Sequence, residues 1–501
     1  MKWVQNCQAI HSMTMKADTK SSLKSLKRFF HIPEDLPTRQ LSYAEARNRI
    51  DMKKLLLINP VGRKSGYLMS KFSTFSPLGL AYVAAVTPDN WEVKIADENF
   101  QPFEFEEADL VAITAFTSNV NRAYEIAGIY RDQGIKVIMG GIHASMLPDE
   151  VMTFADSVIV GEVEGIWKDV LKDFEENKLA PKYIGPRVDL ENYDIVPRRD
   201  LLNPGYMWES VQTSRGCPFN CHFCSVSRYL GKTYRCRKAE DVLNELSSIE
   251  NRHIAFVDDN LIGYSPESVQ RAKNLFQGMI DQNLQKKWWM QTSINAADDE
   301  DVVELAARAG CMFVFIGFEA IRLKSLKEMK KGINVKTGVD NYRRVVDTFH
   351  KYGIGVFGAF IIGNEFETKE YYRELTDYLA HSRIDMFQIS ILTPLPGTDL
   401  MEEITTCDGL IYKDFPRDWD KYRFSYVVHK PKELTLETIY TADNYIKNRL
   451  YSFPTYPLRL LKSLFSLRHL KRVYAIYKFN QALKRSWQNA HYYNKYPKSI
   501  I

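Results

Sequence analysis

The first half of the chain alternates short apolar runs with amphipathic segments. The apolar runs read KKLLLIN, WEVKIAD, DLVAITAF, IKVIMGG and SVIVG. Helical segments lie between them at 77–86 and 120–132, and a further one follows the last run at 165–176. Apolar runs separated by helices are typical of a parallel sheet that is covered on both faces. The pattern therefore predicts a doubly wound, Rossmann-like α/β domain over about 53–185.

A second alternating series follows a stretch that contains Pro, Asp and Tyr, residues 186–208, which we interpret as a linker. Strands are expected near Glu209–Thr213, His253–Val257, Trp288–Ser293, Met312–Phe318, Ile354–Ile362 and Met386–Leu392. Helices are expected between them, for example at 239–250 and 335–352. Six strand–helix units predict an incomplete (β/α) barrel over 209–430, since a closed barrel needs eight.

The two ends of the chain differ from this α/β core. Residues 1–51 are polar, basic and weakly periodic, so we expect a poorly ordered extension there. Met52 precedes the first strand directly and is a second candidate for the start of translation. Residues 431–501 are expected to be helical, and from Tyr451 to Ile501 basic and aromatic residues alternate without a single Asp or Glu.

The composition is that of a soluble globular protein, with 501 residues of which 45% are hydrophobic and 26% charged. Seven cysteines are too few for a disulfide framework in a chain of this length. No secretory signal and no apolar run long enough to cross a bilayer is recognisable, which predicts a cytoplasmic protein. The net charge of +5 is mild, and since no RNA-binding module is present we expect no nucleic-acid partner.

Three of the cysteines, Cys217, Cys221 and Cys224, form a C-x3-C-x2-C cluster in the segment TSRGCPFNCHFCSVSRYL. The loop follows the first barrel strand, at the face where such barrels carry active sites. Three thiolates can hold an iron–sulfur cube and leave one iron with an open position. A zinc site completed by Cys236 or His222 is the alternative, although the spacing matches the usual zinc sites poorly.

These cysteines, with Phe223 before the last of them, resemble the radical SAM enzymes, and the domain order resembles those members that carry an N-terminal cobalamin-binding domain. The resemblance covers roughly 53–430. It implies a [4Fe–4S] cluster on the three cysteines, whose open iron binds S-adenosylmethionine. It also implies cleavage of S-adenosylmethionine to a 5′-deoxyadenosyl radical, with an electron donor such as flavodoxin or ferredoxin.

The segment FVDDNLIG carries Asp258, Asp259 and Asn260 at the end of the second barrel strand. By resemblance this is where the family binds the amino group of the methionine moiety, usually through a GGE-like turn that is absent here. A carboxylate suits an ammonium group. A helix N-cap is the alternative role for these residues.

Other strand ends supply further candidates for S-adenosylmethionine binding. Glu319, in IGFEA, is expected to accept hydrogen bonds from ribose hydroxyls, and Ser293 is expected to line the same cavity with its neighbours Gln291 and Asn295. Gly363, in GAFIIGNEFET, resembles the family's glycine beside the adenine, where a missing side chain permits close approach.

Three segments of the first domain, FSPLGLAYVAA, GGIHASMLPDE and GEVEG, resemble cobalamin-binding domains of this family. The resemblance implies a corrinoid across the carboxyl ends of the sheet, near Gly140, Gly141 and His143. The D-x-H-x-x-G motif of base-off cobalamin enzymes is missing, so His143 is not assigned as a cobalt ligand. A vestigial domain that binds nothing is the alternative.

Just before the first cysteine stand Arg215 and Gly216. Gly216 is expected to serve the turn. Arg215 is expected either in a surface salt bridge or paired with a carboxylate or ligand at the site.

The leading hypothesis is a radical SAM enzyme that performs cobalamin-dependent methylation of an unactivated carbon on a lipid-like substrate, similar to the hopanoid-modifying enzymes. Radical C–C or C–S bond formation or rearrangement without cobalamin is the second hypothesis, and a non-catalytic metal-binding scaffold is the third. The basic, aromatic tail 451–501 favours peripheral contact with a membrane. The alternative is a helical cap over the barrel mouth with a solvated basic face.

Overall fold

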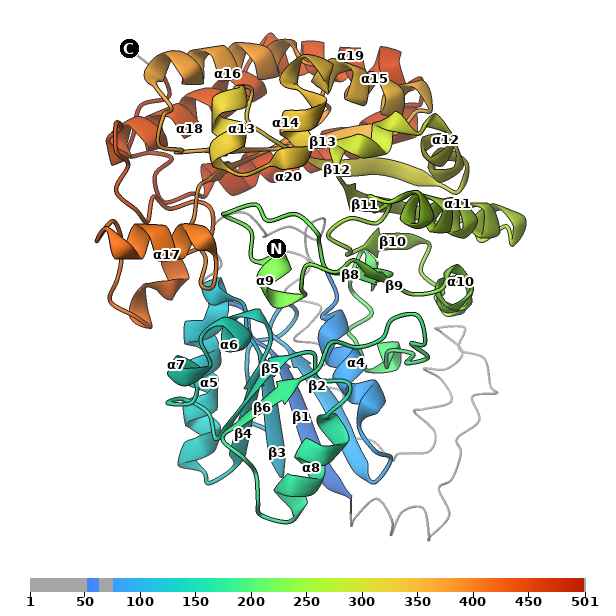
Figure 1. Ribbon diagram of the computed structural model, residues 1–501, viewed down its shortest axis with the longest axis vertical. Helices are drawn as coiled ribbons and strands as arrows, with labels where there is room; N and C mark the ends of the chain where they lie inside the picture. The colour runs from blue at the N-terminus through green and yellow to red at the C-terminus, as the bar shows by residue number, and fades with distance from the viewer. Residues whose placement is uncertain (1–51, 63–74, 500–501) are drawn as a thin grey trace, which may run out of the picture. The chain divides into compact units, whose positions relative to one another are not determined.

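The computed structural model describes residues 52–62 and 75–499 (Figure 1). The extension expected over 1–51 lies outside the described residues. Within them the chain forms two parallel six-stranded sheets and a short antiparallel ribbon. The predicted mixed α/β fold, with a doubly wound domain followed by an incomplete barrel and a helical C-terminal region, is confirmed.

The first sheet has the strand order β2-β1-β3-β4-β5-β6. Its strands are β1 Lys53–Asn59, β2 Trp91–Asp97, β3 Leu110–Thr114, β4 Lys136–Gly140, β5 Ser157–Gly161 and β6 Lys182–Gly185. Its helices are α4 Leu78–Val86, α5 Val120–Asp132, α6 Ile142–Met146, α7 Pro148–Val151 and α8 Trp167–Glu175. The apolar pattern missed β6, because its alternate residues Lys182 and Ile184 are exposed at the sheet edge.

Helices cover both faces of this sheet, as the buried strands predict (Figure 1). Leu55 and Leu57 pack with residues of α4 and α8. On the opposite face α5 packs on β1, β3 and β4, and Trp419 and Tyr422 belong to the same core. Both aromatic residues follow the last strand of the second sheet. Part of the segment assigned to the barrel therefore packs on the first sheet.

The residues predicted to be a linker, 186–208, are not a loose connection. Leu190 and Tyr193 are buried against Leu78 and Tyr82 of α4. Trp208 is buried where the segment enters the second sheet. The segment thus packs on the first domain over much of its length.

The second sheet is open, with the strand order β14-β13-β12-β11-β10-β7, and all its strands are parallel. Its strands are β7 Glu209–Val211, β10 His253–Phe256, β11 Lys287–Thr292, β12 Cys311–Glu319, β13 Gly355–Ile362 and β14 Met386–Ile391. The antiparallel ribbon consists of β8 Ser214–Arg215 and β9 Arg235–Cys236.

The helices of this region are α9 Val226–Tyr229, α10 Ala239–Ser248, α11 Pro266–Asp281, α12 Glu300–Arg308, α13 Leu323–Glu328, α14 Gly332–Thr337, α15 Tyr342–Lys351, α16 Lys369–His381 and α17 Asp399–Thr406. The single helix predicted over 335–352 is wrong. Gly338, with φ +79°, separates α14 from α15, because a left-handed residue ends a helix.

Three helices complete the chain, α18 Leu436–Tyr451, α19 Thr455–Leu467 and α20 Leu470–Gln488. Ile476 and Phe479 of α20 pack with Phe313 and Met386, near the amino ends of β12 and β14. The expected cap over the barrel mouth is therefore wrong in its position, because α20 lies at the amino ends of the strands. Among the helices described, none combines the length and the hydropathy that a bilayer crossing needs.

Candidate functional site

The cysteine loop leaves the second sheet at the carboxyl end of β7 and passes through β8. Gly216 lies between β8 and the first cysteine with φ +91°. A Cβ atom there would lie 2.2 Å from the carbonyl oxygen of Thr233, so only glycine fits this turn, as expected. The loop is closed by a hydrogen bond of 3.1 Å from the Cys217 amide to the carbonyl oxygen of Gly231.

All three cysteine side chains of the loop are free and partly accessible. Burial raises the pKa of the Cys224 thiol to about 12 and also raises the pKa of Cys221. Phe223, between them, packs against apolar residues of α13 and α17. The thiols therefore need a nearby positive charge to become thiolates.

Over residues 52–62 and 75–499, no three or more His, Cys, Asp and Glu side chains gather closely enough to hold one metal ion. In an iron–sulfur cube each thiolate binds a different iron, so the thiolates stand farther apart than the ligands of a single ion. Three free thiols on one short loop match the three-thiolate ligand set of a [4Fe–4S] cluster that leaves one iron open.

Asp258, just after β10, is bound by the segment that leads from β7 into β8. Its Oδ1 accepts hydrogen bonds from the Thr213 amide and hydroxyl, both at 2.9 Å, and from the Ser214 hydroxyl at 2.6 Å. Its Oδ2 has no hydrogen-bond partner within the described part of the chain. Burial raises the pKa of this carboxyl. A buried carboxylate oxygen without a donor fits the ammonium group of S-adenosylmethionine.

The next two residues have different surroundings. Asp259 keeps an accessible side chain, next to the fully buried Asp258. The Asn260 amide oxygen accepts from Thr292 at 3.2 Å, and its amide nitrogen donates to the Ser293 hydroxyl at 3.3 Å. Asn260 and Ser293 thus join the ends of β10 and β11.

Glu319 ends β12 in a left-handed conformation, with φ +65°. The pairing of β12 with β13 shifts register at the same place. Such strained positions are concentrated at functional sites. The Glu319 carboxylate is paired with Lys331, whose Nζ lies 2.7 Å from Oε1.

Lys331 is a site residue that the sequence analysis missed. Burial alone would lower its pKa, but the charges of Glu319 and Cys221 raise it. Its positive charge also interacts with Cys224. The cysteine loop is held next to it, because the His222 amide donates to the carbonyl oxygen of Met329 at 3.2 Å.

Gly363 follows β13 with φ +89°. Its amide donates to Glu367 Oε2 at 2.7 Å. A Cβ atom at this position would reach Ile439 of α18 at 3.5 Å. Gly363 thus stands in a turn whose left-handed backbone conformation favours glycine.

At the carboxyl edge of the first sheet, Gly140 ends β4 and Gly141 follows with φ +93°. His143 is buried, and its ring nitrogens contact Thr117 at 3.1 Å and Glu150 at 3.3 Å. Both ring nitrogens thus lie within hydrogen-bond distance of side-chain oxygen atoms of the same domain. Phe116, beyond the end of β3, is 64% exposed. Small residues and an exposed aromatic ring at this edge fit the flat apolar face of a corrinoid.

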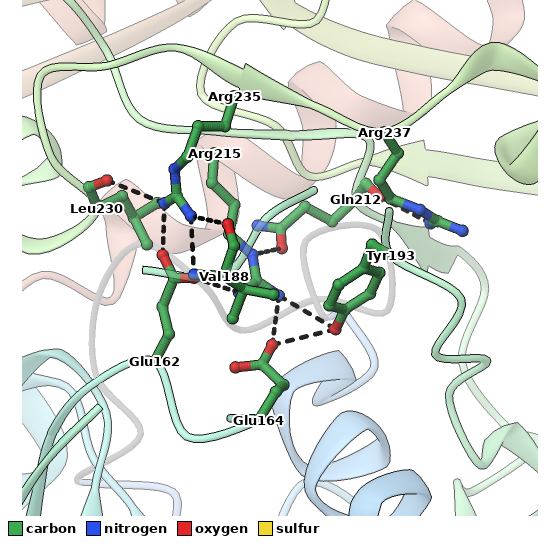
Figure 2. Close-up of polar contacts among 9 residues, drawn as sticks. All are labelled: Glu162, Glu164, Val188, Tyr193, Gln212, Arg215, Leu230, Arg235 and Arg237. Carbon is green, nitrogen blue, oxygen red and sulfur yellow. Dashed lines mark hydrogen bonds and ion pairs between the residues drawn. The ribbon is translucent and has the colours of Figure 1, made fainter. Parts of the chain in front are cut away.

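The loop after β5 joins this edge to the cysteine loop. Arg215 Nη1 lies 3.1 Å from Glu162, and Arg215 Nη2 lies 2.6 Å from Glu164 (Figure 2). Arg215 is buried, so of the two expected roles the pairing with carboxylates is confirmed and the surface salt bridge is wrong. The fold and the site together define an iron–sulfur enzyme of the S-adenosylmethionine-dependent class with a second, corrinoid-type domain.

Comparison with protein families agrees with this class. The B12 binding domain matches residues 68–171, and the Radical SAM superfamily matches residues 211–379. The bacteriochlorophyllide d C-12(1)-methyltransferase of Chlorobaculum tepidum is 31% identical over 435 residues, which cover 82% of this chain and 89% of that protein. The chain therefore belongs to the radical SAM enzymes that carry a B12-binding domain. Its cofactors are a [4Fe–4S] cluster, S-adenosylmethionine and cobalamin.

Other similar proteins extend this comparison. The hopanoid C-2 methylase of Rhodopseudomonas palustris is 27% identical over 361 residues, covering 69% of this chain and 68% of that protein. The radical S-adenosylmethionine methyltransferase TsrM from Kitasatospora setae, solved with cobalamin and a [4Fe-4S] cluster, has a TM-score of 0.65 at 18% identity. That match covers 87% of this chain and 100% of the other.

The cobalamin-dependent S-adenosylmethionine radical enzyme OxsB with aqua-cobalamin has a TM-score of 0.63 at 14% identity, and the match covers 92% of this chain and 80% of the other. At these identities the two solved structures show a shared fold.

Proposed function

We propose that this enzyme transfers a methyl group to an unactivated carbon of an apolar small molecule. When bound, the cluster and S-adenosylmethionine supply a 5′-deoxyadenosyl radical, and the corrinoid supplies the methyl group. Overall, a C–H bond of the substrate becomes a C–CH3 bond. Two molecules of S-adenosylmethionine and two electrons are consumed, and S-adenosylhomocysteine, methionine and 5′-deoxyadenosine are released.

The observation that carries the proposal is the junction of the two cofactor-binding edges. The buried pairs of Arg215 with Glu162 and Glu164 hold the cysteine loop against the carboxyl-end loop of the first sheet. A radical and a methyl donor must reach the same carbon, so the two edges have to be fixed together. The named activities of the relatives, methylation of bacteriochlorophyllide and of hopanoids, support an apolar substrate.

The residues at the carboxyl ends of the barrel strands receive roles in this proposal. Cys217, Cys221 and Cys224 hold the cluster. The free Oδ2 of Asp258, with Asp259 beside it, binds the ammonium group of S-adenosylmethionine. The electrons come from a donor such as flavodoxin or ferredoxin.

The test uses the full chain, reconstituted anaerobically with iron, sulfide and hydroxocobalamin. We expect stoichiometric corrinoid absorbance and, with a reductant and an apolar extract of the host cell, transfer of a deuterated methyl group from S-adenosylmethionine into an apolar product. Formation of 5′-deoxyadenosine without bound corrinoid and without labelled product would favour radical bond formation or rearrangement. No 5′-deoxyadenosine at all would favour a metal-binding scaffold.

We also propose that α19 and α20 contact the surface of an anionic bilayer. Seven large apolar side chains of this region are exposed: Phe453, Leu458, Leu461, Phe465, Leu470, Tyr474 and Tyr477. Three of them are spaced at i, i+3 and i+7 along α19, and three at i, i+4 and i+7 along α20, so each set shares one helix face. We call these seven residues the apolar face.

The charges around the apolar face favour an anionic partner. Lys462, Lys471 and Lys478 are exposed on the same two helices, and no Asp or Glu occurs from Tyr451 to Ile501. An apolar stripe flanked by lysine side chains is typical of helices that lie in the interface of an anionic membrane.

Exchange of two apolar residues of α19 tests this contact. The double variant Leu461→Ser with Phe465→Ser is expected to bind vesicles of phosphatidylserine and phosphatidylcholine at least about tenfold more weakly than the unchanged chain, since each buried side chain contributes about 1.5–3 kcal/mol. Co-sedimentation measures the difference. Ile184→Ser, at an exposed apolar residue of β6, is the matched control. Equal binding of both variants, or equal binding to purely zwitterionic vesicles, would contradict the proposal.

A further inference from the structure

Glu162 and Glu164 follow β5 of the first sheet and are both buried. Glu162 Oε2 lies 3.1 Å from Arg215 Nη1 and 3.1 Å from Arg235 Nη1, and its Oε1 is paired with Arg235 Nη2 (Figure 2). Glu164 Oε1 accepts from Arg215 at 2.6 Å and from the Tyr193 hydroxyl at 3.1 Å. Two carboxylates and two guanidinium groups therefore form one neutral cluster, in which Arg235 is partly accessible and the other three side chains are buried.

The two arginines stand at the two ends of the cysteine loop. Arg215 lies directly opposite Arg235 in the antiparallel ribbon of β8 and β9. Cys217 follows Arg215 by two residues. Arg235 also donates to the carbonyl oxygen of Leu230 at 3.1 Å, next to Gly231, which closes the loop. The cluster thus fixes the loop at both ends.

The remaining hydrogen bonds leave the carboxylates little freedom. The Val188 amide donates to Glu162 Oε2 at 2.8 Å, and the Val188 carbonyl oxygen accepts from Arg235 at 2.6 Å. Burial alone would raise the pKa of Glu162, but the hydrogen bonds from Arg235 and the charge of Arg215 lower it. Buried ion pairs contribute little net stability, whereas loss of one partner leaves a buried charge uncompensated. The main consequence of the cluster is therefore a fixed geometry.

We infer that Glu162 and Glu164 are positioning residues for the iron–sulfur centre. They belong to the corrinoid-type domain, yet through Arg215 and Arg235 they set where the cysteine loop stands. The first domain thereby prepares the S-adenosylmethionine site of the second, even when no corrinoid chemistry takes place. The inference requires the cluster on the three cysteines and does not depend on methyl transfer.

Glu162→Gln tests the inference against Glu245→Gln. Glu245 is a matched control because it is equally buried and also pairs with two arginines, Arg199 and Arg237, but it lies within the second domain. Hydrogen exchange of the full chain without cofactors is the first measurement. In Glu162→Gln we expect amides of residues 214–236 to exchange at least about tenfold faster, with no such change in Glu245→Gln.

Electron paramagnetic resonance of the reconstituted, reduced protein is the second measurement. In Glu162→Gln the S-adenosylmethionine concentration that half-shifts the cluster signal should rise at least about tenfold, since small misplacements of reacting groups have large costs. Glu162→Asp, which keeps the charge, should recover part of this loss. If Glu162→Gln does not fold, Glu164→Gln is measured instead, with the same expectations. The inference would be overturned if Glu162→Gln and Glu245→Gln showed the same hydrogen exchange of the amides of residues 214–236 and the same response of the cluster signal to S-adenosylmethionine.

Discussion

Replacement of Cys217 by alanine is expected to abolish formation of 5′-deoxyadenosine from S-adenosylmethionine in the reduced, reconstituted protein. Two thiolates cannot complete the set that the cube needs. A loss of more than about 100-fold is expected, because even outer partners of metal ligands contribute about 10–100-fold. Chromatography of the nucleoside product and determination of bound iron measure the effect.

Cys407→Ala is the control for this experiment. Cys407 is an exposed free thiol directly after α17. Its removal therefore changes the number of cysteines without altering the cysteine loop that holds the cluster. Cys217→Ser retains the size of the side chain next to the Tyr264 hydroxyl, which lies 3.3 Å from the Cys217 sulfur. We expect Cys217→Ser to be folded and inactive. Activity of Cys217→Ser near that of Cys407→Ala would contradict the assignment of the cluster.

Much of the fold could be predicted because its signals are local. The run KKLLLIN forms a strand buried on both faces, and its neighbours in the sheet show the same pattern. The three cysteines were recognisable because their ligand set lies on one short loop. Asp258, too, could be placed at a strand end, since the carboxyl ends of parallel strands meet at one edge.

The remainder depended on contacts between residues far apart in the chain. Lys331 stands in the basic segment KEMKKGINVK, where its charge does not distinguish it from solvated lysines such as Lys330. Arg215 and Glu162 are 53 residues apart, and nothing in either local pattern pairs them. Trp419 packs on a sheet that ends more than two hundred residues earlier. These contacts are set by tertiary packing, which the periodicity of the sequence does not reveal.

Lys331→Met is expected to have the second large effect, because it leaves the Glu319 carboxylate buried without its 2.7 Å partner. Removal of one member of a buried pair costs about 3–5 kcal/mol. The same variant removes the positive charge that faces Cys221 and Cys224, so binding of S-adenosylmethionine to the reconstituted protein should weaken as well. The urea midpoint of the apo chain and equilibrium dialysis measure the two effects.

The double variant Glu319→Gln with Lys331→Met separates the two effects. It removes both charges, so most of the lost stability should return, whereas S-adenosylmethionine binding should stay weak. Lys432→Met is the control, since the Lys432–Glu365 pair has a similar distance of 2.6 Å but is largely exposed and should contribute at most about 1 kcal/mol. A midpoint of Lys331→Met no lower than that of Lys432→Met would contradict a buried pair at this strand end.

The variant Gly317→Ala tests the position of the same carboxylate without removing either charge. An alanine at 317 would place its Cβ atom 2.2 Å from Glu319 Oε1. The carboxylate should therefore be displaced, and S-adenosylmethionine binding should weaken.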